Sequence, residues 1–478
     1  MKKNLIVVLL ALVSISAYAY DFETDGVYYN IVSRDDRTCE VSYDPERPYS
    51  GTLTIPDTTV CNGFTFKVIR MRKYISLGTV TSLIIKANWT SIESSAFYGR
   101  SNLVSITLPT TVTSIGFAAF QGCTSLTSVN LPDCLTTINS KMFYGCKSLT
   151  TITIPASVTT IGSYAFYDSG ITSIDLPENL EDIGDWAFYR TPLKSITIPS
   201  GVKWIREHTF SLCRDLTTVV SSKPISVFSQ AFEYCSSLVD LPPIDWIDPH
   251  AFQYCTSLKT VTFYQSLKKI RYEAFKNCTS LSHITLPENV TNIESNAFSG
   301  CTALETVNLS SRVGLTNYVF QDCSKLPTIT IPSNASLGYS TFSGCSSLKS
   351  VYVYKDNPEG IDANYFEGCP EDMVVYIPQG SLSLYRITPG WMNLKNLVEF
   401  DPTAITCLKG SEGISIKSDG GQLTVSGLND GEQIQVYDVS GVLIGKATAT
   451  AGTAIVNVSA SARFVVLKVG NESLKVKL

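Results

Sequence analysis

Apolar residues recur along the middle of the chain with a period of 20 to 24 residues. Each unit contains a phenylalanine, an aliphatic residue five positions before it and, in most units, a leucine six positions after it. A period of this length predicts a repeat solenoid, in which each unit forms one coil and stacking buries the apolar side chains. The repeat phenylalanines are Phe97, Phe120, Phe143, Phe166, Phe188, Phe210, Phe232, Phe252, Phe275, Phe298, Phe320, Phe342 and Phe366.

One strand is expected in each coil. After the leucine, apolar and polar residues alternate, as in Leu149–Ile154, and Pro155 follows. Alternation of this kind is typical of a half-buried strand, and a proline ends the hydrogen bonding of a strand. We therefore predict a solenoid of about 13 units over residues 85–373, mostly β, with short turns or 3-10 segments.

The first residues of the chain have the pattern of a secretory signal peptide. Met1–Lys3 is basic, Leu5–Val13 is apolar, and Ala17–Ala19 supplies the small residues of a cleavage site. Residues 1–19 are therefore expected to be removed, so that the mature chain begins near Tyr20. No later stretch approaches the ~18 apolar residues of a membrane-spanning helix. We expect an exported chain without a transmembrane segment, at the cell surface or in the extracellular space; the periplasm is the alternative.

The segments that flank the repeat are expected to cap it, because both ends of a solenoid expose strand edges. We predict a β-rich N-terminal capping domain over residues 20–84 and a C-terminal cap over residues 374–401. Beyond them, residues 402–478 contain short alternating strands separated by Gly and Asn-Asp turns. This pattern is typical of a small β-sandwich.

The repeat units resemble those of a known family. Leu108–Val129 places Leu-Pro, Ile, Phe, Cys and Leu at the spacing of BspA-like leucine-rich repeats, which occur in exported bacterial proteins. Asp25–Ile31 and Tyr49–Pro56 resemble the β-rich N-terminal domain of that family, and Tyr376–Tyr385 with Pro389–Trp391 resembles its closing segment. The resemblance implies a leucine-rich-repeat solenoid and a role as a surface adhesin.

The C-terminal segment is similar to a second family. Val436–Val442 and Val469–Leu478 resemble type IX secretion sorting domains, which implies routing to the cell surface. Ala462–Phe464 departs from the Gly-x-Tyr that is common before the last hairpin of those domains. An Ig-like accessory domain without a sorting role is therefore the alternative interpretation of residues 402–478.

Composition and charge narrow the classes of function. The 478 residues are 44% hydrophobic and 17% charged, which is typical of a folded globular chain. The formal net charge of −5 gives no basic surface for nucleic acid. There is no G-x-S-x-G, H-E-x-x-H, G-x-G-x-x-G or Walker-type motif and no paired metal-ligand spacing. We therefore expect no enzyme activity, no catalytic residues, no metal site and no cofactor.

Two of the three histidines share one column of the repeat, two positions before the phenylalanine. The residues in this column differ widely from unit to unit, which predicts that His208 and His250 are exposed. One coil separates them, a distance of about 10 Å. They are therefore too far apart to bind one metal ion directly.

Most cysteines belong to one column, three positions after the phenylalanine. Two interpretations are open: free thiols that pack as small apolar groups, or disulfides between neighbouring coils. The units of Phe166 and Phe188 lack this cysteine and have a turn one residue shorter, which predicts that the shorter turn removes the inward slot. In the N-terminal domain, Cys39 and Cys61 could pair. The cysteines of the column are Cys123, Cys146, Cys213, Cys235, Cys255, Cys278, Cys301, Cys323, Cys345 and Cys369. Those without an evident partner are Cys134 and Cys407.

Aromatic residues gather in two further columns, one position after and two positions before the phenylalanine. Stacking of coils should bring five of them into one patch, and large aromatics are common anchors for protein and sugar ligands. Trp204 and Trp246 share another column, six positions before the phenylalanine, with Ser226 between them. Packing of rings between coils is the alternative interpretation. The five patch residues are Tyr144, Tyr164, Tyr167, Trp186 and Tyr189.

These features together favour non-catalytic recognition outside the cell. The partners that we expect are host extracellular proteins or glycans, bound along the solenoid surface by a monomeric protein. A structural spacer or surface-layer component without a selective ligand is the second hypothesis. A carbohydrate-processing enzyme is the third.

Overall fold

The computed structural model describes residues 20–72, 75–400, 415–419, 422–437, 443–458, 464–469 and 472–477. The chain forms two compact units: residues up to 282 with 294–302, and residues 283–293 with those from 303 onward. The predicted signal peptide, Cys407 and Ala462–Arg463 lie outside the described residues.

The N-terminal domain is a five-stranded sheet with the strand order β1-β2-β3-β6-β5. Alternation along the sixth strand buries Phe66 and Val68, which pack with the fully buried Tyr29 and Val41 in the core of the domain. This domain is β-rich, as the sequence predicts. Its strands are β1 (Phe22–Thr24), β2 (Val27–Ser33), β3 (Thr38–Val41), β5 (Thr58–Cys61) and β6 (Phe64–Met71).

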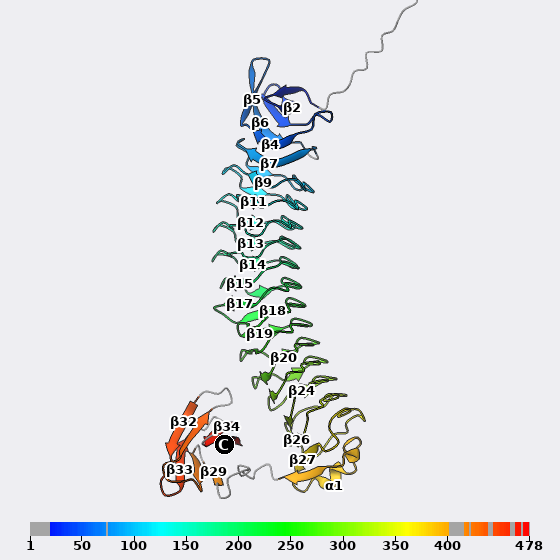
Figure 1. Ribbon diagram of the computed structural model, residues 1–478, viewed down its shortest axis with the longest axis vertical. Coiled ribbons are helices and arrows are strands. Elements are labelled where there is room, and N and C mark those ends of the chain that lie inside the picture. Colours follow the sequence, from blue (N-terminus) through cyan, green and yellow to red (C-terminus); the bar gives the residue numbers. More distant parts are fainter. Residues whose placement is uncertain are drawn as a thin grey trace, which may run out of the picture. The chain divides into compact units, whose positions relative to one another are not determined.

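Two rows of parallel strands follow the coils of the first unit (Figure 1). The first row contains the segment after the repeat leucine and has the order β4-β7-β9-β11, with β15-β17 further along. Its first two strands lie within residues 20–84, so parallel pairing begins inside the N-terminal segment. The strands of this row are β4 (Ser50–Ile55), β7 (Thr79–Ile85), β9 (Ser105–Thr107), β11 (Ser128–Val129), β15 (Ser195–Ile198) and β17 (Thr218–Ser221).

The second row contains the aliphatic residue five positions before the phenylalanine. Most of its strands have only two residues, which is too short for a period-two pattern, and the expectation of one strand per coil misses it. Conversely, no strand forms at Leu149–Ile154, although Ile152 and Ile154 are buried as the alternation predicts. The strands of this row are β8 (Ser91–Ile92), β10 (Ser114–Ile115), β12 (Thr137–Ile138), β13 (Thr160–Ile161), β14 (Asp182–Ile183), β16 (Trp204–Ile205), β18 (Ile225–Val227), β19 (Ile244–Ile247) and β20 (Lys269–Ile270).

The second unit continues the repeat and ends in a cap. Tyr385 of α1 (Leu382–Tyr385) and Trp391 of η1 (Trp391–Asn393) are fully buried. The Tyr385 hydroxyl donates to the Lys355 carbonyl at 2.8 Å, which ties the cap to the last coils. The strands of this part are β21 (His283–Thr285), β22 (Asn292–Ile293), β23 (Thr306–Asn308), β24 (Gly314–Leu315), β25 (Thr328–Ile331), β26 (Ser350–Val353), β27 (Val374–Pro378) and β28 (Leu397–Phe400).

The C-terminal region forms two antiparallel sheets, with the orders β29-β30-β33 and β32-β31-β34-β35. Buried aliphatic residues of both sheets, among them Leu423, Val425, Ile434 and Leu467, share one core. This arrangement confirms the predicted β-sandwich. Its strands are β29 (Ser415–Asp419), β30 (Gln422–Ser426), β31 (Gln433–Tyr437), β32 (Leu443–Thr448), β33 (Thr453–Asn457), β34 (Phe464–Val469) and β35 (Glu472–Lys477).

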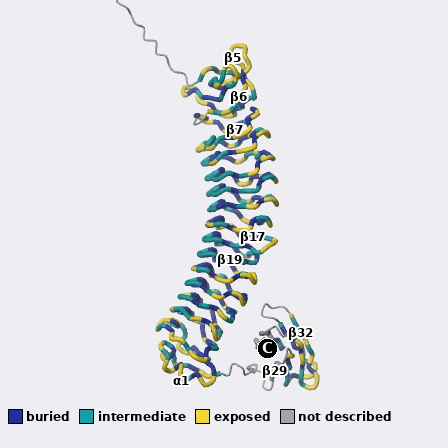
Figure 2. The backbone as a smooth tube through the Cα atoms, turned by 180° about the vertical axis from the view of Figure 1, so that it is seen from behind, coloured by how far each residue is buried: buried dark blue, intermediate teal, exposed yellow. Residues whose placement is uncertain are grey.

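The repeat phenylalanines form a stack of rings inside the first unit. From Phe97 to Phe298 neighbouring rings lie 5.1–5.5 Å apart, nearly parallel, and each is fully buried. The aliphatic column beside them, for example Ile115 and Ile138, is also fully buried. Figure 2 shows the buried positions recurring coil after coil. The predicted inward columns are therefore the core.

Two positions in each coil from Phe97 to Phe342 adopt left-handed backbone conformation, two residues before and two residues after the phenylalanine. In the column before it, Tyr164, Trp186 and His208 have φ of 60°, 61° and 53°. This conformation costs a non-glycine residue about 1–2 kcal/mol. The cost is offset because the N–H of each donates to a carbonyl of the next coil, as from Trp186 to Glu207 at 3.0 Å.

The repeat cysteines that the structure describes are free thiols, and all except Cys369 are buried. In nine of the ten, the thiol donates to the carbonyl of the repeat phenylalanine one coil earlier, as from Cys146 Sγ to Phe120 O at 3.2 Å. The prediction that a shorter turn removes this slot is wrong. Ser169 and Thr191 fill it at 3% and 1% exposure, because a hydroxyl fits the same space and Thr191 Oγ1 donates to Phe188 O at 2.8 Å.

Candidate binding surface

Three tyrosines one position after the phenylalanine form a column of stacked rings. Tyr144 lies 4.6 Å from Tyr167, and Tyr167 lies 4.7 Å from Tyr189, centroid to centroid. The rings are within 14° of parallel. The spacing follows from the stacking of coils, which repeats each side chain at about the separation of neighbouring strands.

A second column, two positions before the phenylalanine, stacks beside the first. Tyr164 lies 5.8 Å from Trp186, and Trp186 lies 3.7 Å from His208. The columns contact each other where Trp186 lies 4.7 Å from Tyr189. We call these six residues the aromatic stack. Its members are Tyr144, Tyr164, Tyr167, Trp186, Tyr189 and His208, and the structure thus brings together the five residues that the sequence predicts.

His208 is not the exposed residue that its variable column predicts. The residue is only 8% exposed because Trp186 covers one face of the imidazole and Tyr189 meets its edge. Burial lowers the pKa of His208, so the neutral ring is favoured at neutral pH. The signal for this was Trp186 at the same position one coil earlier, which provides a ring surface for the imidazole.

The aromatic stack presents ring edges outward, not ring faces. Its five aromatic members other than His208 are all half-buried, since each ring lies against its neighbours. Lys141 closes one end, with Nζ 5.5 Å from the centroid of Tyr164. Such rings keep amphipathic edges and hydroxyl groups for a partner while their faces stabilise the stack.

Trp204 and Trp246 do not belong to the aromatic stack. They lie on β16 and β19, on either side of Ser226 of β18, and are 44% and 45% exposed. Arginines lie over both indoles, with Arg206 6.0 Å from Trp204 and Arg271 5.4 Å from Trp246. The seven aromatic residues that the sequence singles out therefore form two separate surfaces.

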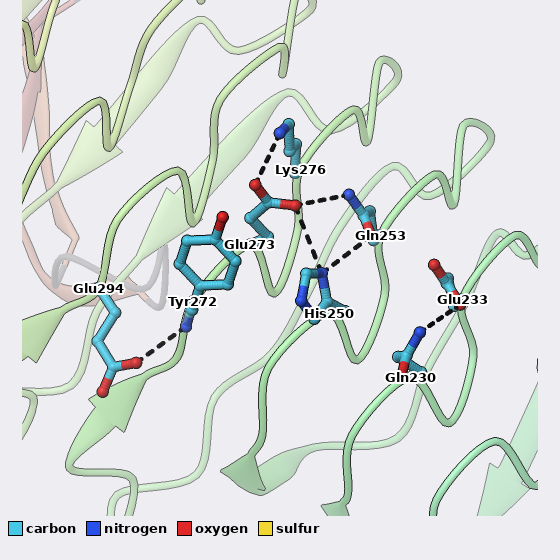
Figure 3. A network of polar contacts seen from close by, with 8 residues as sticks. All are labelled: Gln230, Glu233, His250, Gln253, Tyr272, Glu273, Lys276 and Glu294. Atoms are coloured by element: carbon cyan, nitrogen blue, oxygen red, sulfur yellow. Dashed lines mark hydrogen bonds and ion pairs between the residues drawn. The ribbon is translucent and has the colours of Figure 1, made fainter.

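Beyond His208 the same two columns become polar (Figure 3). Glu273 is 7% exposed and accepts hydrogen bonds from Lys276 Nζ at 2.7 Å and Gln253 Nε2 at 2.8 Å. His250 Nδ1 lies 3.4 Å from Glu273 Oε2 and 3.0 Å from Gln253 Oε1. Burial alone would raise the pKa of Glu273, but hydrogen bonds from Lys276 and Tyr272 outweigh it and lower the pKa. This network is neutralised and internally satisfied.

Glu233 lies in the same columns, between the aromatic stack and this network. Its carboxylate accepts Gln230 Nε2 at 3.0 Å. Within the described part of the chain, no lysine, arginine or histidine nitrogen lies within ion-pair distance of it. Burial raises the pKa of Glu233, and the hydrogen bond from Gln230 and the charge of His250, which acts from beyond ion-pair distance, offset this only in part. This polar part of the surface could not be predicted from the sequence, because ion pairing across coils depends on the directions in which the side chains point.

The structure also bears on the predicted cysteine pair, metal site and membrane segment. Cys39 and Cys61 are free thiols, the first buried and the second partly exposed, and their pairing stays a prediction. Among the residues that the structure describes, no group of three or more His, Cys, Asp or Glu side chains could hold a metal ion. None of the helices in the described ranges is long and apolar enough to cross a membrane.

Comparisons with known proteins place the repeat in a family. The profile of the BspA-type leucine-rich repeat region matches with six copies, over residues 67–176, 136–242 and 245–371. Together these segments cover more than half of the chain. Among proteins with curated descriptions, none matches.

One solved structure supports the same fold, and two others are similar to parts of the chain. A leucine-rich repeat protein from Bacteroides ovatus aligns with a TM-score of 0.56 and 24% identity, over 80% of this chain and 100% of that chain. A leucine-rich repeat protein of T. pallidum is 27% identical over 45% of this chain and 88% of its own, with a TM-score of 0.33. A leucine-rich cell surface protein from Faecalibacterium prausnitzii is 23% identical over 70% and 94% of the two chains, with a TM-score of 0.37.

Proposed function

The chain belongs to the BspA-type leucine-rich repeat family, and on this premise we propose that it is an exported, non-enzymatic recognition protein of the bacterial surface. It binds a host extracellular protein or glycan along the solenoid, and the aromatic stack is the central contact. The single observation that carries this proposal is the aromatic stack itself, six rings held on one surface by neighbouring coils.

A rigid surface of this kind suits binding because little side-chain entropy remains to be lost when a partner arrives. Tyrosine and tryptophan are also the residues that most often dominate binding energy at protein interfaces. The covered ring faces favour a protein partner over a glycan, since a sugar ring packs against an open aromatic face. We therefore place host extracellular proteins before glycans.

The test is a binding experiment with residues 20–478 against extracellular matrix proteins, mucins and a glycan array at physiological salt. Changing Tyr167, Trp186 and Tyr189 together to serine should weaken binding of a selective ligand by at least about tenfold, because each lost anchor costs on the order of 1 kcal/mol or more. The matched control changes Trp204 and Trp246 to serine, since these rings lie outside the aromatic stack.

Circular dichroism and thermal unfolding of each variant establish that the coils stay folded. The single variant Tyr189→Ser, at the end of its column, disturbs the packing least and should show the same direction of change. Equal affinity in the triple variant and the wild type would contradict the role of the aromatic stack. If the folded wild type binds no ligand of the panel, this result would favour the spacer hypothesis instead.

For the C-terminal β-sandwich we propose a sorting role that follows export through residues 1–19. The support is the resemblance of Val436–Val442 and Val469–Leu478 to type IX sorting domains. Deleting residues 402–478 in a bacterium that has this secretion system should leave the protein in the periplasm, as measured by protease accessibility on intact cells. Unchanged surface exposure would favour the Ig-like accessory interpretation.

A further inference from the structure

The tyrosine column of the aromatic stack ends at a small residue. After Tyr144, Tyr167 and Tyr189, the next coil places Ser211 in the column, and the coil after that places Glu233. Ser211 is 1% exposed, and its side chain is too short to extend as far from the backbone as the neighbouring tyrosine rings. On the side toward the next coil, Tyr189 has no ring of its own column against it, and His208 of that coil meets it nearly perpendicularly at 6.3 Å, whereas its other face lies on Tyr167.

Glu233 lies on the far side of Ser211 as a half-buried carboxylate that makes no ion pair within the described part of the chain. His250 acts on this carboxylate from beyond ion-pair distance and lies 3.4 Å from Glu273. Two other cations of this surface are paired with other carboxylates. Arg190 Nε lies 3.8 Å from Asp168 Oδ1, and Lys276 Nζ lies 2.7 Å from Glu273. Figure 3 shows Glu233 joined to Gln230 alone among the residues drawn. The charge of Glu233 also acts on Tyr189, whose pKa is raised by burial and, to a smaller extent, by this carboxylate.

Two carboxylates of one surface thus have different surroundings. Glu273 receives Lys276, Gln253 and His250, and the pKa of its carboxyl is lowered. Glu233 receives one neutral amide, and the pKa of its carboxyl is raised. A half-buried charge without a counter-ion costs stability, so the fold gains nothing from Glu233 on its own. A cation supplied by a binding partner would pair with Glu233 and offset this cost.

Resting on the proposed function, we propose that Tyr189 and Glu233 together bind an arginine side chain of the protein partner, with the guanidinium held above Ser211. The two residues are two coils apart, about 10 Å along the stack. A guanidinium that lies about 4 Å from the ring and about 2.8 Å from the carboxylate covers about 7 Å of this separation, and the Glu233 side chain turns toward Tyr189 to close the rest.

The chain already uses this chemistry within itself. Lys141 lies over Tyr164, and Arg206 and Arg271 lie over Trp204 and Trp246. Arginine fits better than lysine, because its planar fork can stack on a ring and pair with a carboxylate at the same time, whereas an ammonium group is compact. The net charge of −5 also favours the approach of a basic partner.

The experiment titrates the chain of residues 20–478 with capped hexa-arginine and hexa-lysine peptides at physiological salt. We expect hexa-arginine to bind more tightly than hexa-lysine, and Glu233→Gln to weaken hexa-arginine by about tenfold, as expected for the loss of a charge-assisted contact. The matched control is Glu207→Gln, which removes the same charge beside the aromatic stack from a side chain that is 54% exposed. Its effect should stay below about twofold, since exposed charges contribute little.

Stability supplies a second readout. Because the pKa of Glu233 is raised in the folded state, its ionised form destabilises the fold at pH above that pKa, and the cost disappears below the ordinary carboxyl pKa of about 4.3. Glu233→Gln should therefore melt at or above the wild type at pH 7, and the difference should vanish near pH 4. A lower melting temperature at pH 7 would mean that Glu233 is structural and would overturn the proposal.

Equal losses of affinity in Glu233→Gln and Glu207→Gln, or equal affinity for the two peptides, would also overturn the proposal, because either result means general attraction to an acidic surface.

A selective partner from the extracellular panel would allow the arginine site and the proposed function to be tested separately. If the triple serine variant loses that partner and Glu233→Gln keeps it fully, the aromatic stack binds but the arginine site is wrong. If hexa-arginine binds as expected and no extracellular ligand is found, the arginine contact holds and the recognition function fails.

Discussion

Replacing Phe166 by alanine is expected to lower the free energy of unfolding by about 3–5 kcal/mol, the range for a fully buried phenylalanine in a close-packed core. The ring is fully buried and lies 5.4 Å from Phe143 and 5.2 Å from Phe188. Alanine would leave a hole bounded by rings on both sides, and these rings are fixed by their own coils. The hole therefore cannot collapse readily, which places the cost at the upper part of the range.

Denaturant unfolding, together with limited proteolysis, measures this effect. Because each coil contacts only its neighbours, the loss should be local at first, and cleavage should appear near residues 160–175 before the chain unfolds as a whole. Tyr98→Ala is the matched control: it removes an aromatic ring of similar size that is 56% exposed, and it should change stability by less than about 0.5 kcal/mol. Similar effects of the two substitutions would contradict the assignment of the phenylalanine column as the core.

The repeat thiols are expected to react with iodoacetamide roughly a thousandfold more slowly than an ordinary thiol in the native protein. Burial raises the pKa of Cys213 and of Cys301 to about 12. The thiolate is the reactive form, so each unit of pKa above the usual 8.5 or so removes another factor of about ten at pH 8. The closed packing of the coils slows access of the reagent further.

A time course of alkylation followed by peptide mass spectrometry measures the rate at each cysteine. Cys134, which is exposed, serves as the internal control and should be modified early. In guanidinium chloride all fourteen cysteines should react at comparable rates. If the column could be alkylated only after reduction, the interpretation as disulfides between coils would replace that of free thiols, and the same spectra would then show whether Cys39 and Cys61 are paired.

The period of the sequence predicts the fold of the repeat because the same side chains face inward in each coil. Phe120, Ile115 and Leu126 occupy the core positions that their spacing indicates. The second row of strands was beyond this reasoning, since a pair such as Ser114–Ile115 is too short to show alternation. The strand expected at Leu149–Ile154 fails for the opposite reason: alternation fixes which side chains are buried, not whether the backbone pairs regularly.

The candidate binding surface could also be predicted only in part. Tyr144, Tyr167 and Tyr189 could be placed together from the sequence, because equal positions in neighbouring coils become neighbours in space. His208 could not, since a variable column was interpreted as exposed when its side chains pack on one another. The isolation of Glu233 from ion pairs could not be predicted either. It depends on the directions in which long side chains point, and the position of a residue in a column does not give these directions.

The left-handed residues described for each coil have a consequence for how such a protein changes. Their backbone hydrogen bonds to the next coil are made whether the side chain is alanine, lysine, tyrosine, tryptophan or histidine, as at Ala118, Lys141, Tyr164, Trp186 and His208. The path of the chain is thus independent of the chemistry displayed at that position. Exchanging whole coils by recombination would therefore change the side chains displayed on the surface and leave its scaffold unaltered, with no need to rebuild a core.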